Sequence, residues 1–162
     1  MAISWADILE WETGPLDSIG SDLLEASNGL RSAYEQGEGA LQAVQSQGNA
    51  VTAMRATTIS NLASLERALT NVNGALIAIE GARDGVATVM ANINALQAYA
   101  EANDCTILSD GSVTGKGTEN EQGEPSIALA SISINIGKIL KQADQVDTDL
   151  YHALSDINTD TY

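Results

Sequence analysis

Apolar residues recur at spacings of three and four along most of this chain, the heptad pattern of helices that bury one narrow seam. Three such runs predict helices over residues 15–46, 50–103 and 126–158, and the second has no internal proline. The predicted seams are Leu16, Ile19, Leu23, Ala26, Leu30, Ala33, Gly37, Ala40 and Val44; Leu62, Leu65, Leu69, Val72, Leu76, Ile79, Val86, Met90 and Ile93; and Leu129, Ile132, Ile136, Ile139, Ala143, Val146, Leu150, Ala153 and Ile157.

Shorter elements lie before and between these helices. Ser4 is placed to cap a short helix over 5–11. Turn-forming residues over 45–49 predict a hairpin turn, with Gly48 as the C-cap of the helix before it. Asp110-Gly111 favours a two-residue turn within a small hairpin over 105–114. Residues 115–125 are rich in Gly, Glu, Asn and Gln, which predicts a flexible linker.

These elements predict one all-α domain over 1–162. We expect an elongated antiparallel helical hairpin or bundle, with one very long helix, a short N-terminal helix, a small β-hairpin or loop at Asp110-Gly111 and a C-terminal helix packed back. The long helix would exceed the one before it by roughly twenty residues, or about 30 Å. The apolar stripe over 81–102 must therefore be covered by the C-terminal helix or by another chain.

Composition supports slender helical seams, because hydrophobic residues are 44% of the chain while aromatics are 4% and Phe is absent. A formal charge of -15 would repel nucleic acid and anionic lipid headgroups, so neither is an expected partner. The first ten residues carry acids where a signal peptide carries positive charge. No apolar run is long enough for a membrane span, so we expect no membrane insertion.

The sequence offers little for catalysis. Phosphate-binding glycine loops, Cys-x-x-Cys pairs and a nucleophile elbow are absent from it, so we expect no enzyme, no cofactor and no metal site. Asp149, His152 and Asp156 share a helix face and could hold a metal weakly, but a solvated polar face is the favoured interpretation. Cys105 is expected to be a small buried hydrophobe, with an exposed thiol as the alternative.

Candidate partner anchors are the two tryptophans, Trp5 and Trp11, and the stripe residues Val86, Met90 and Ile93. The alternative for the tryptophans is that they cap one end of the bundle. Four asparagines near the seams would specify helix register if they lie inside, and otherwise lie on the solvated side: Asn71, Asn73, Asn92 and Asn94.

The order of these elements resembles the WXG-type (ESAT-like) helical domains of actinobacterial type VII secretion substrates, in the long form usually found ahead of toxin or hydrolase domains. The resemblance spans nearly the whole chain, and the order of its motifs carries the specificity. The motifs are Ser4-Trp5-Ala6; Gln47-Gly48-Asn49-Ala50 with Ala53 and Arg55; Asp110-Gly111-Ser112-Val113; and Lys141-Gln142-Ala143-Asp144-Gln145-Val146-Asp147-Thr148-Asp149-Leu150 with Ala153-Leu154.

Two positions depart from the family pattern. Ser46-Gln47-Gly48 stands where the family has its Trp-x-Gly turn. The family's export signal, Tyr-x-x-x-Asp or Glu after the long helix, is represented by Tyr99 and Asn103, with Asn at the acidic position. Tyr34 and Glu38 fit the letters of the signal but lie within the second helix. A partner subunit is expected to carry the signal if this chain does not.

The resemblance implies a non-enzymatic interaction or targeting module that acts by helix pairing. Its partners would be a second copy in a homodimer or another helical hairpin protein in a heterodimer, together with the secretion machinery. It would be cytoplasmic before export, and then secreted or at the cell surface by a route independent of a signal peptide. The alternative is a structural or adaptor helical bundle, such as a phage or cell-envelope component, with no secretion role.

Overall fold

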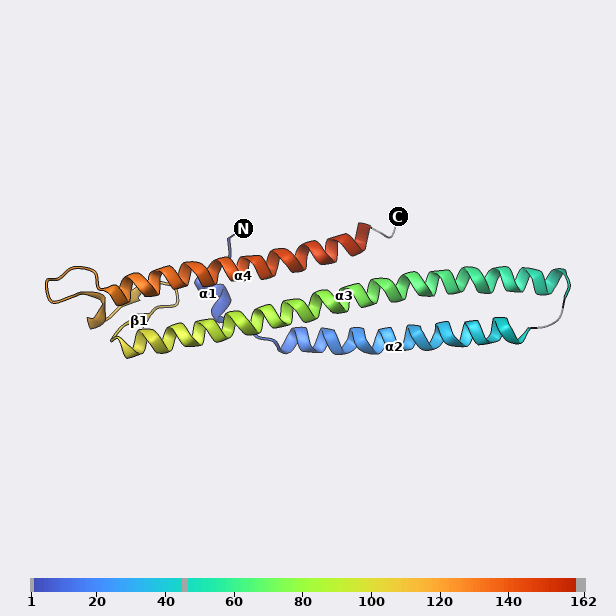
Figure 1. Cartoon of the computed structure of the whole chain (residues 1–162), viewed down its shortest axis with the longest axis horizontal. Coiled ribbons are helices and arrows are strands. Elements are labelled where there is room, and N and C mark those ends of the chain that lie inside the picture. The colour runs from blue at the N-terminus through green and yellow to red at the C-terminus, as the bar shows by residue number, and fades with distance from the viewer. Residues whose placement is uncertain (1, 45–46, 160–162) are drawn as a thin grey trace. The chain divides into compact units, whose positions relative to one another are not determined.

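The computed structural model of the chain describes residues 2–44 and 47–159, most of which lie in four α-helices (Figure 1). The helices are α1 (Trp5–Leu9), α2 (Gly14–Ala43), α3 (Asn49–Ala102) and α4 (Ile127–Thr159). Between α3 and α4 lie the antiparallel strands β1 (Thr106–Ile107) and β2 (Val113–Thr114) and the 3-10 helix η1 (Lys116–Thr118). The predicted all-α fold class is confirmed.

The chain divides into two compact units. Residues 1–16 and 81–152 form the core unit, and residues 17–80 and 153–162 form the hairpin unit. The division follows from the neighbours of α3. Its residues before Gly81 pack against α2 and the end of α4, and its residues from Gly81 onward pack against an earlier part of α4.

In the hairpin unit, α2 and α3 run antiparallel, because their contacts follow in reverse order along the two helices. Gly20 lies opposite Ile79 and Gly37 lies opposite Leu62. Between them, the Ser27 hydroxyl donates a hydrogen bond of 2.7 Å to Oδ1 of Asn73. Ser27 is only 2% exposed. A polar pair therefore occupies the interior of this seam, and it supports the register hypothesis for Asn73.

The predicted seam of α2 is half-buried at every other position, namely Leu16, Leu23, Leu30, Gly37 and Val44, and is wrong at the positions between them. Ile19 is 44% exposed, and the predicted positions Ala26, Ala33 and Ala40 are exposed as well. Alanine gains little from burial, whereas Ser27 finds a partner in Asn73, so the helix turns a neighbouring row inward. The half-buried and buried positions of α2 in this unit are Gly20, Leu23, Ser27, Leu30, Tyr34, Gly37 and Leu41. By contrast, every predicted seam position of α3 and α4 is buried or half-buried.

Two glycines permit close helix packing, one in each unit. A Cβ added at Gly37 would lie 2.7 Å from Cδ2 of Leu62 in the hairpin unit. A Cβ added at Gly85 would lie 2.6 Å from Cγ2 of Val146 in the core unit. At Gly85 the stiff Val146 leaves no room for a larger residue, whereas at Gly37 the contact is with a terminal methyl of Leu62, which could shift. By contrast, a Cβ at Gly29 or Gly39 would meet no described atom within 4 Å.

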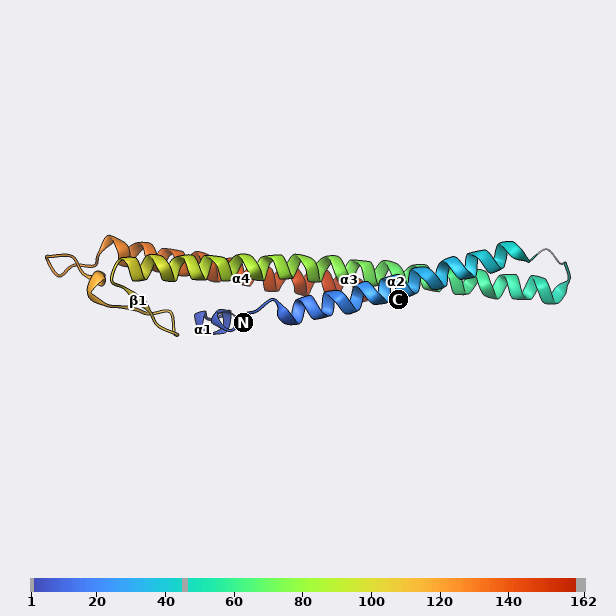
Figure 2. The same cartoon turned by 90° about the horizontal axis from the view of Figure 1, so that it is seen from below.

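In the core unit, α1 and the β-hairpin lie on one side of the pair formed by α3 and α4 (Figure 2). Ser4 caps α1 as predicted, because its hydroxyl accepts from the backbone N–H of Asp7 while Asp7 Oδ2 accepts from the Ser4 N–H. The helix turns Trp5 and Ile8 inward. They join a buried cluster with Val89, Ile93, Leu96, Ala100, Cys105, Ile132, Ile136, Ile139 and Ala143.

The end of α3 is closed by a Schellman motif. Asp104 adopts a left-handed conformation with φ 56°, its N–H donates to the carbonyl of Glu101, and the Cys105 N–H donates to the carbonyl of Ala100 at 2.8 Å. Ala100 and Cys105 are both buried, which supplies the apolar contact usual in this motif. Cys105 is thus a buried free cysteine, as its favoured interpretation predicted.

The β-hairpin pairs Thr106 with Thr114 and Ile107 with Val113. Asp110-Gly111 does not form the two-residue turn that we expected. The Leu108 N–H donates to the Ser112 carbonyl and the Gly111 N–H donates to the Leu108 carbonyl, so the loop also includes Ser109. Gly111 has φ 87° and packs against Trp5, which places the loop on the core.

Residues 115–125 were expected to form a flexible linker, but they are held by hydrogen bonds. The Ser126 N–H donates to the Thr118 carbonyl at 2.9 Å, and the Gly117 N–H donates to the Asp104 carbonyl at 3.0 Å. A Cβ at Gly117 would collide with the carbonyl of Asn103. The composition suggested flexibility, whereas the glycines here allow the backbone to pack closely.

Candidate interaction site

The structure buries most of the residues proposed as partner anchors. Trp5 is 2% exposed, and Val86 and Ile93 are also buried within the core unit, while Met90 and Trp11 are half-buried. The reason is that α4 covers the apolar stripe over 81–102: Gly85 contacts Val146, and Asn92 Nδ2 donates to Gln142 Oε1 at 2.8 Å. These residues form the interior of the unit and are not exposed anchors.

The turn between α2 and α3 is described in part, since Ser46 lies outside the described residues. Gln47 is exposed. Gly48 has φ 147°, and its carbonyl accepts from the Thr52 N–H at 2.9 Å. Gly48 therefore lies at the N-cap of α3, whereas we expected it to be the C-cap of α2. Its conformation still requires glycine.

Tyr99 and Asn103 lie one turn apart at the end of α3. The Asn103 side-chain amide donates to the Tyr99 carbonyl at 2.8 Å, so Asn103 satisfies a free carbonyl of the last turn. The Tyr99 side chain is 41% exposed. Tyr34, the other tyrosine that fits the letters of the export signal, is half-buried in the hairpin unit.

A cleft of about 670 Å³ lies beside Tyr99, between α3 and α4 of the core unit. Its buried wall includes Leu96 and Ile139, and Lys138 is the charged residue of its lining. That size suits a small ligand or a few side chains of a partner. The other lining residues are Asn92, Ala95, Ser131, Asn135 and Gln142.

The carboxyl groups with shifted pKa values lie elsewhere in the unit. Hydrogen bonds from the Ser4 side chain and backbone lower the pKa of Asp7, and hydrogen bonds from the Ser112 side chain and backbone lower the pKa of Asp110. Both shifts favour the charged form, and both groups are exposed. These carboxylates stabilise a helix cap and a loop.

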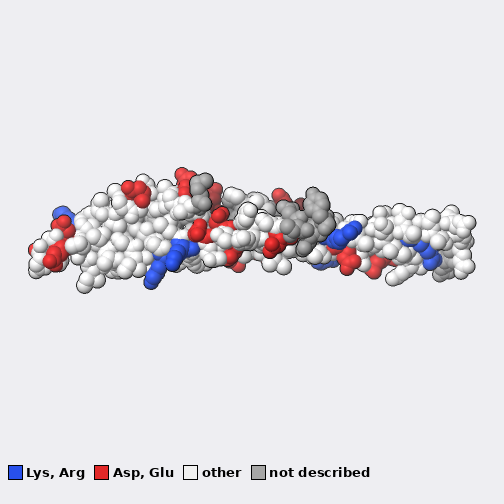
Figure 3. All heavy atoms as spheres, turned by 90° about the horizontal axis from the view of Figure 1, so that it is seen from above, with Lys and Arg blue, Asp and Glu red and all other residues white. Residues whose placement is uncertain are grey.

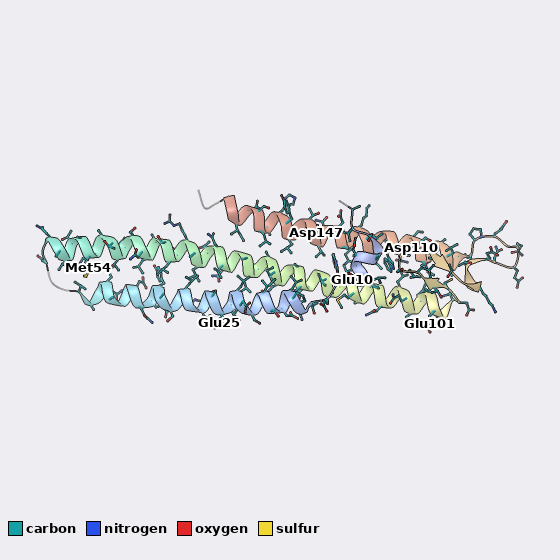
Figure 4. All side chains as sticks on the ribbon, turned by 180° about the vertical axis from the view of Figure 1, so that it is seen from behind. Glu10, Glu25, Met54, Glu101, Asp110 and Asp147 are labelled. Atoms are coloured by element: carbon teal, nitrogen blue, oxygen red, sulfur yellow. The ribbon has the colours of Figure 1, made fainter. Side chains whose placement is uncertain are left out.

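The remaining charged and metal-ligating candidates lie on the surface. His152 is exposed, with its ring 5.6 Å from that of Tyr151, and Asp149 accepts from Gln145 Nε2 at 2.6 Å. Within residues 2–44 and 47–159, no three His, Cys, Asp or Glu side chains gather as a metal site would require. Acidic side chains such as Glu25, Glu101 and Asp147 project from the helix surfaces (Figure 4). None of the described helices combines the length and apolarity needed to cross a membrane.

Large apolar side chains remain exposed on helices of both units, and the heptad pattern did not predict them. In the hairpin unit, Ile59 and Ile77 are 57% and 71% exposed. In the core unit, Ile127 is 88% exposed and Ile134 is 59% exposed, both on α4. A signal was present in the sequence, because no charged residue lies between Glu124 and Lys138. Such a run can give a helix two apolar faces.

Comparisons with models of protein families, with curated proteins and with solved structures found no match to this chain.

Proposed function

We propose that this chain is a non-enzymatic interaction module that pairs its helices with those of another protein chain. The observation that carries this proposal is the exposure of large apolar side chains on one helix of the core unit, α4, where Ile127 is 88% and Ile134 is 59% exposed. Exposed apolar surface on a folded helix is costly in water, and contiguous patches of it mark interaction sites. A facing helix with its own apolar stripe would remove this surface from water.

We further propose that the module belongs to the class of type VII secretion substrates or their partners. Support comes from the order of motifs that resembles the WXG-type domains, from Ser4-Trp5-Ala6 at the start to the acidic helix at the end. An antiparallel α2–α3 hairpin with α4 packed back on α3 would present helix faces to a helical hairpin partner or a second copy. The chain would be cytoplasmic before export, and then secreted or at the cell surface without a signal peptide.

The test of this class is export from the native host. The tagged chain should appear in the culture medium when the secretion ATPase is intact and should stay in the cells when the ATPase gene is deleted. Equal amounts in the medium of both strains would contradict the proposal and would favour a structural or adaptor bundle.

A matched pair of tyrosine variants tests the signal within the chain. Tyr99 and Tyr151 are both exposed on helices of the core unit. If Tyr99 takes part in recognition, Tyr99→Ala should reduce export severalfold, while Tyr151→Ala should leave it unchanged. If both variants are exported normally, the signal is supplied by a partner, and co-purification with a helical protein encoded beside this one becomes the deciding measurement.

A further inference from the structure

The helix α4 carries a second apolar stripe on the side opposite the core. Its inward seam, which includes Ile132 and Ile139, is buried in the core unit. On the opposite side, four residues recur at spacings of three and four, and all are exposed. We call these residues the outer seam: Ile127, Ala130, Ile134 and Gly137.

The outer seam is free of described neighbours. Ile127 is 88% exposed and Ile134 is 59% exposed, and a Cβ added at Gly137 would meet no described atom within 4 Å. Large and small residues alternate along it, with an isoleucine followed each time by alanine or glycine. That alternation is a shape that an identical seam can fill, because each isoleucine needs a small residue opposite.

Charges of opposite sign lie at the two ends of the outer seam. Lys138 and Lys141 follow it and are exposed, and the structure records no ion pair for either lysine among the described residues. Three exposed acids precede it: Glu119, Glu121 and Glu124. In Figure 3, which views α4 from the side away from α3, a broad stretch without Lys, Arg, Asp or Glu side chains follows the charged tip of the core unit.

We propose that the outer seam binds the outer seam of a second copy of this chain, antiparallel and about a two-fold axis. The inference names a surface and a partner for the helix pairing proposed above, and it rests on that proposed function. It does not depend on the secretion role.

The size pattern selects one register. When Ile127 of one copy faces Gly137 of the second copy, Ile134 faces Ala130, because both helices rise equally per residue. Each large side chain then meets a small one, and the two-fold axis repeats both contacts. A two-fold interface of this kind is closed and gives a dimer.

The charges favour the same register. It places Lys141 of one copy beside the segment 121–124 of the second copy, which carries Glu121 and Glu124. The two-fold axis makes this contact twice. A parallel arrangement would instead bring lysine to lysine and glutamate to glutamate, so the charges also set the antiparallel direction.

The contact is short. From Ile127 to Lys141 the helix rises about 21 Å, so the buried area would fall in the class of weak or transient interfaces. We therefore expect dimers at protein concentrations of about 0.1–1 mM and monomers at about 1 µM.

The experiment is sedimentation velocity on the full chain over this concentration range, with two variants that each add one carboxylate to α4. Ile134→Asp should weaken the dimer by about tenfold or more, because a charge would be buried without a partner. Ser133→Asp, exposed beside the outer seam, should dimerise like the original chain. Circular dichroism should show the same helix content in all three, since both positions are exposed.

A charge exchange tests whether the charged ends of two copies of this chain meet in the dimer. Lys138→Glu with Lys141→Glu should remain monomeric alone, and so should Glu121→Lys with Glu124→Lys, because each homodimer would bring like charges together. An equal mixture of the two variants should restore the dimer, since both ends then pair opposite charges. No other occupant of the outer seam predicts this rescue.

Two outcomes would overturn the inference: an original chain that stays monomeric throughout, or a dimer that Ile134→Asp leaves unchanged. The proposed function fails separately. If the chain binds a different helical protein, and Ile134→Asp leaves that binding intact, helix pairing stands while the outer seam as its surface is wrong. If Ile134→Asp abolishes that binding in a chain that never dimerises, the surface is right and the second copy is the wrong occupant.

Discussion

The core unit and the hairpin unit use the same heptad pattern but bury it to different depths. In the core unit, four elements enclose side chains such as Ile8, Val89 and Ile132, which are at most 1% exposed. In the hairpin unit, the buried apolar residues among those described are Leu62 and Ile79, at 9% and 6%, together with the polar Ser27. Over most of its length the hairpin unit has only α2 and α3 among the described residues, joined near Gly74 by the end of α4, and two helices cannot enclose a side chain on all sides, whereas α1 and the β-hairpin close the core unit.

This difference in burial predicts that the core unit is the more stable of the two. The core unit has buried area enough to hold its helices in place, since each enclosed aliphatic side chain contributes about 1.5–3 kcal/mol. The hairpin unit encloses fewer apolar side chains, so its helices should open more readily than those of the core unit.

The largest effect is expected for Ile132→Ala in the core unit. Ile132 is 0% exposed, so the cavity and lost burial should lower the free energy of unfolding by about 2–5 kcal/mol. Ile134→Ala on the same helix is the matched control, and it should change stability by less than about 0.5 kcal/mol because Ile134 is 59% exposed. Denaturant unfolding followed by tryptophan fluorescence measures this, since Trp5 and Trp11 both belong to the core unit. Equal losses for both variants would contradict a closed core.

Gly85→Ala should destabilise the core unit by about 1–3 kcal/mol, although alanine is the better helix former. Its Cβ would lie 2.6 Å from the stiff side chain of Val146. Gly81→Ala is the control, because its Cβ would meet no described atom within 4 Å, and it should stabilise the protein by up to about 1 kcal/mol. The two variants should change the free energy of unfolding in opposite directions. If both stabilise the protein, α3 and α4 do not approach closely at Gly85.

Ser27→Ala tests the polar seam of the hairpin unit. It removes the donor to Asn73 and leaves a partly buried amide oxygen without its partner, which should cost about 1–2 kcal/mol. Adding Asn73→Leu should recover much of the loss by making the seam apolar. Circular dichroism and hydrogen exchange of α2 amides report on this unit. A double variant no more stable than Ser27→Ala would show that the pair contributes little.

The smallest effect concerns acid pH. Hydrogen bonds from Ser4 lower the pKa of Asp7 below 3.8 in the folded protein. The stabilisation is therefore complete above the unfolded pKa and is lost as the pH falls through the folded value. In Ser4→Ala, the pKa of Asp7 should rise toward 3.8 in an NMR titration, while the pKa of Asp110, held by Ser112, stays low. An unchanged pKa of Asp7 would mean that the capping box does not form in solution.

The sequence predicted the fold class, the helix-capping role of Ser4 and the buried rows of α3 and α4. Those rows were predictable because Leu, Ile and Val occupy them. The inward side of α2 was predicted in part, at Leu23, Leu30 and Gly37. Its other positions, Gly20, Ser27 and Tyr34, were not predictable from apolar residues, because they face inward through the hydrogen bond of Ser27 to Asn73 and the close approach of α3.

The candidate anchors were buried by elements that are distant in the sequence. Trp5, Val86 and Ile93 were candidate anchors because large apolar residues on a single helix could bind a partner. In the folded chain, α1, the β-hairpin and α4 enclose them. The exposed outer seam of α4 was not predicted, because its isoleucines lie in a run without charged residues that would have marked it as the solvent-facing side.

Hydrogen exchange along α3 compares the two units within a single helix, because α3 contributes residues to both. We expect amides from 81 to 100 to exchange at least about tenfold more slowly than amides from 53 to 80, since opening the core unit exposes far more buried surface. Uniform protection along the whole of α3, or slower exchange before Gly81 than after it, would contradict the claim that the enclosed core belongs to the core unit alone.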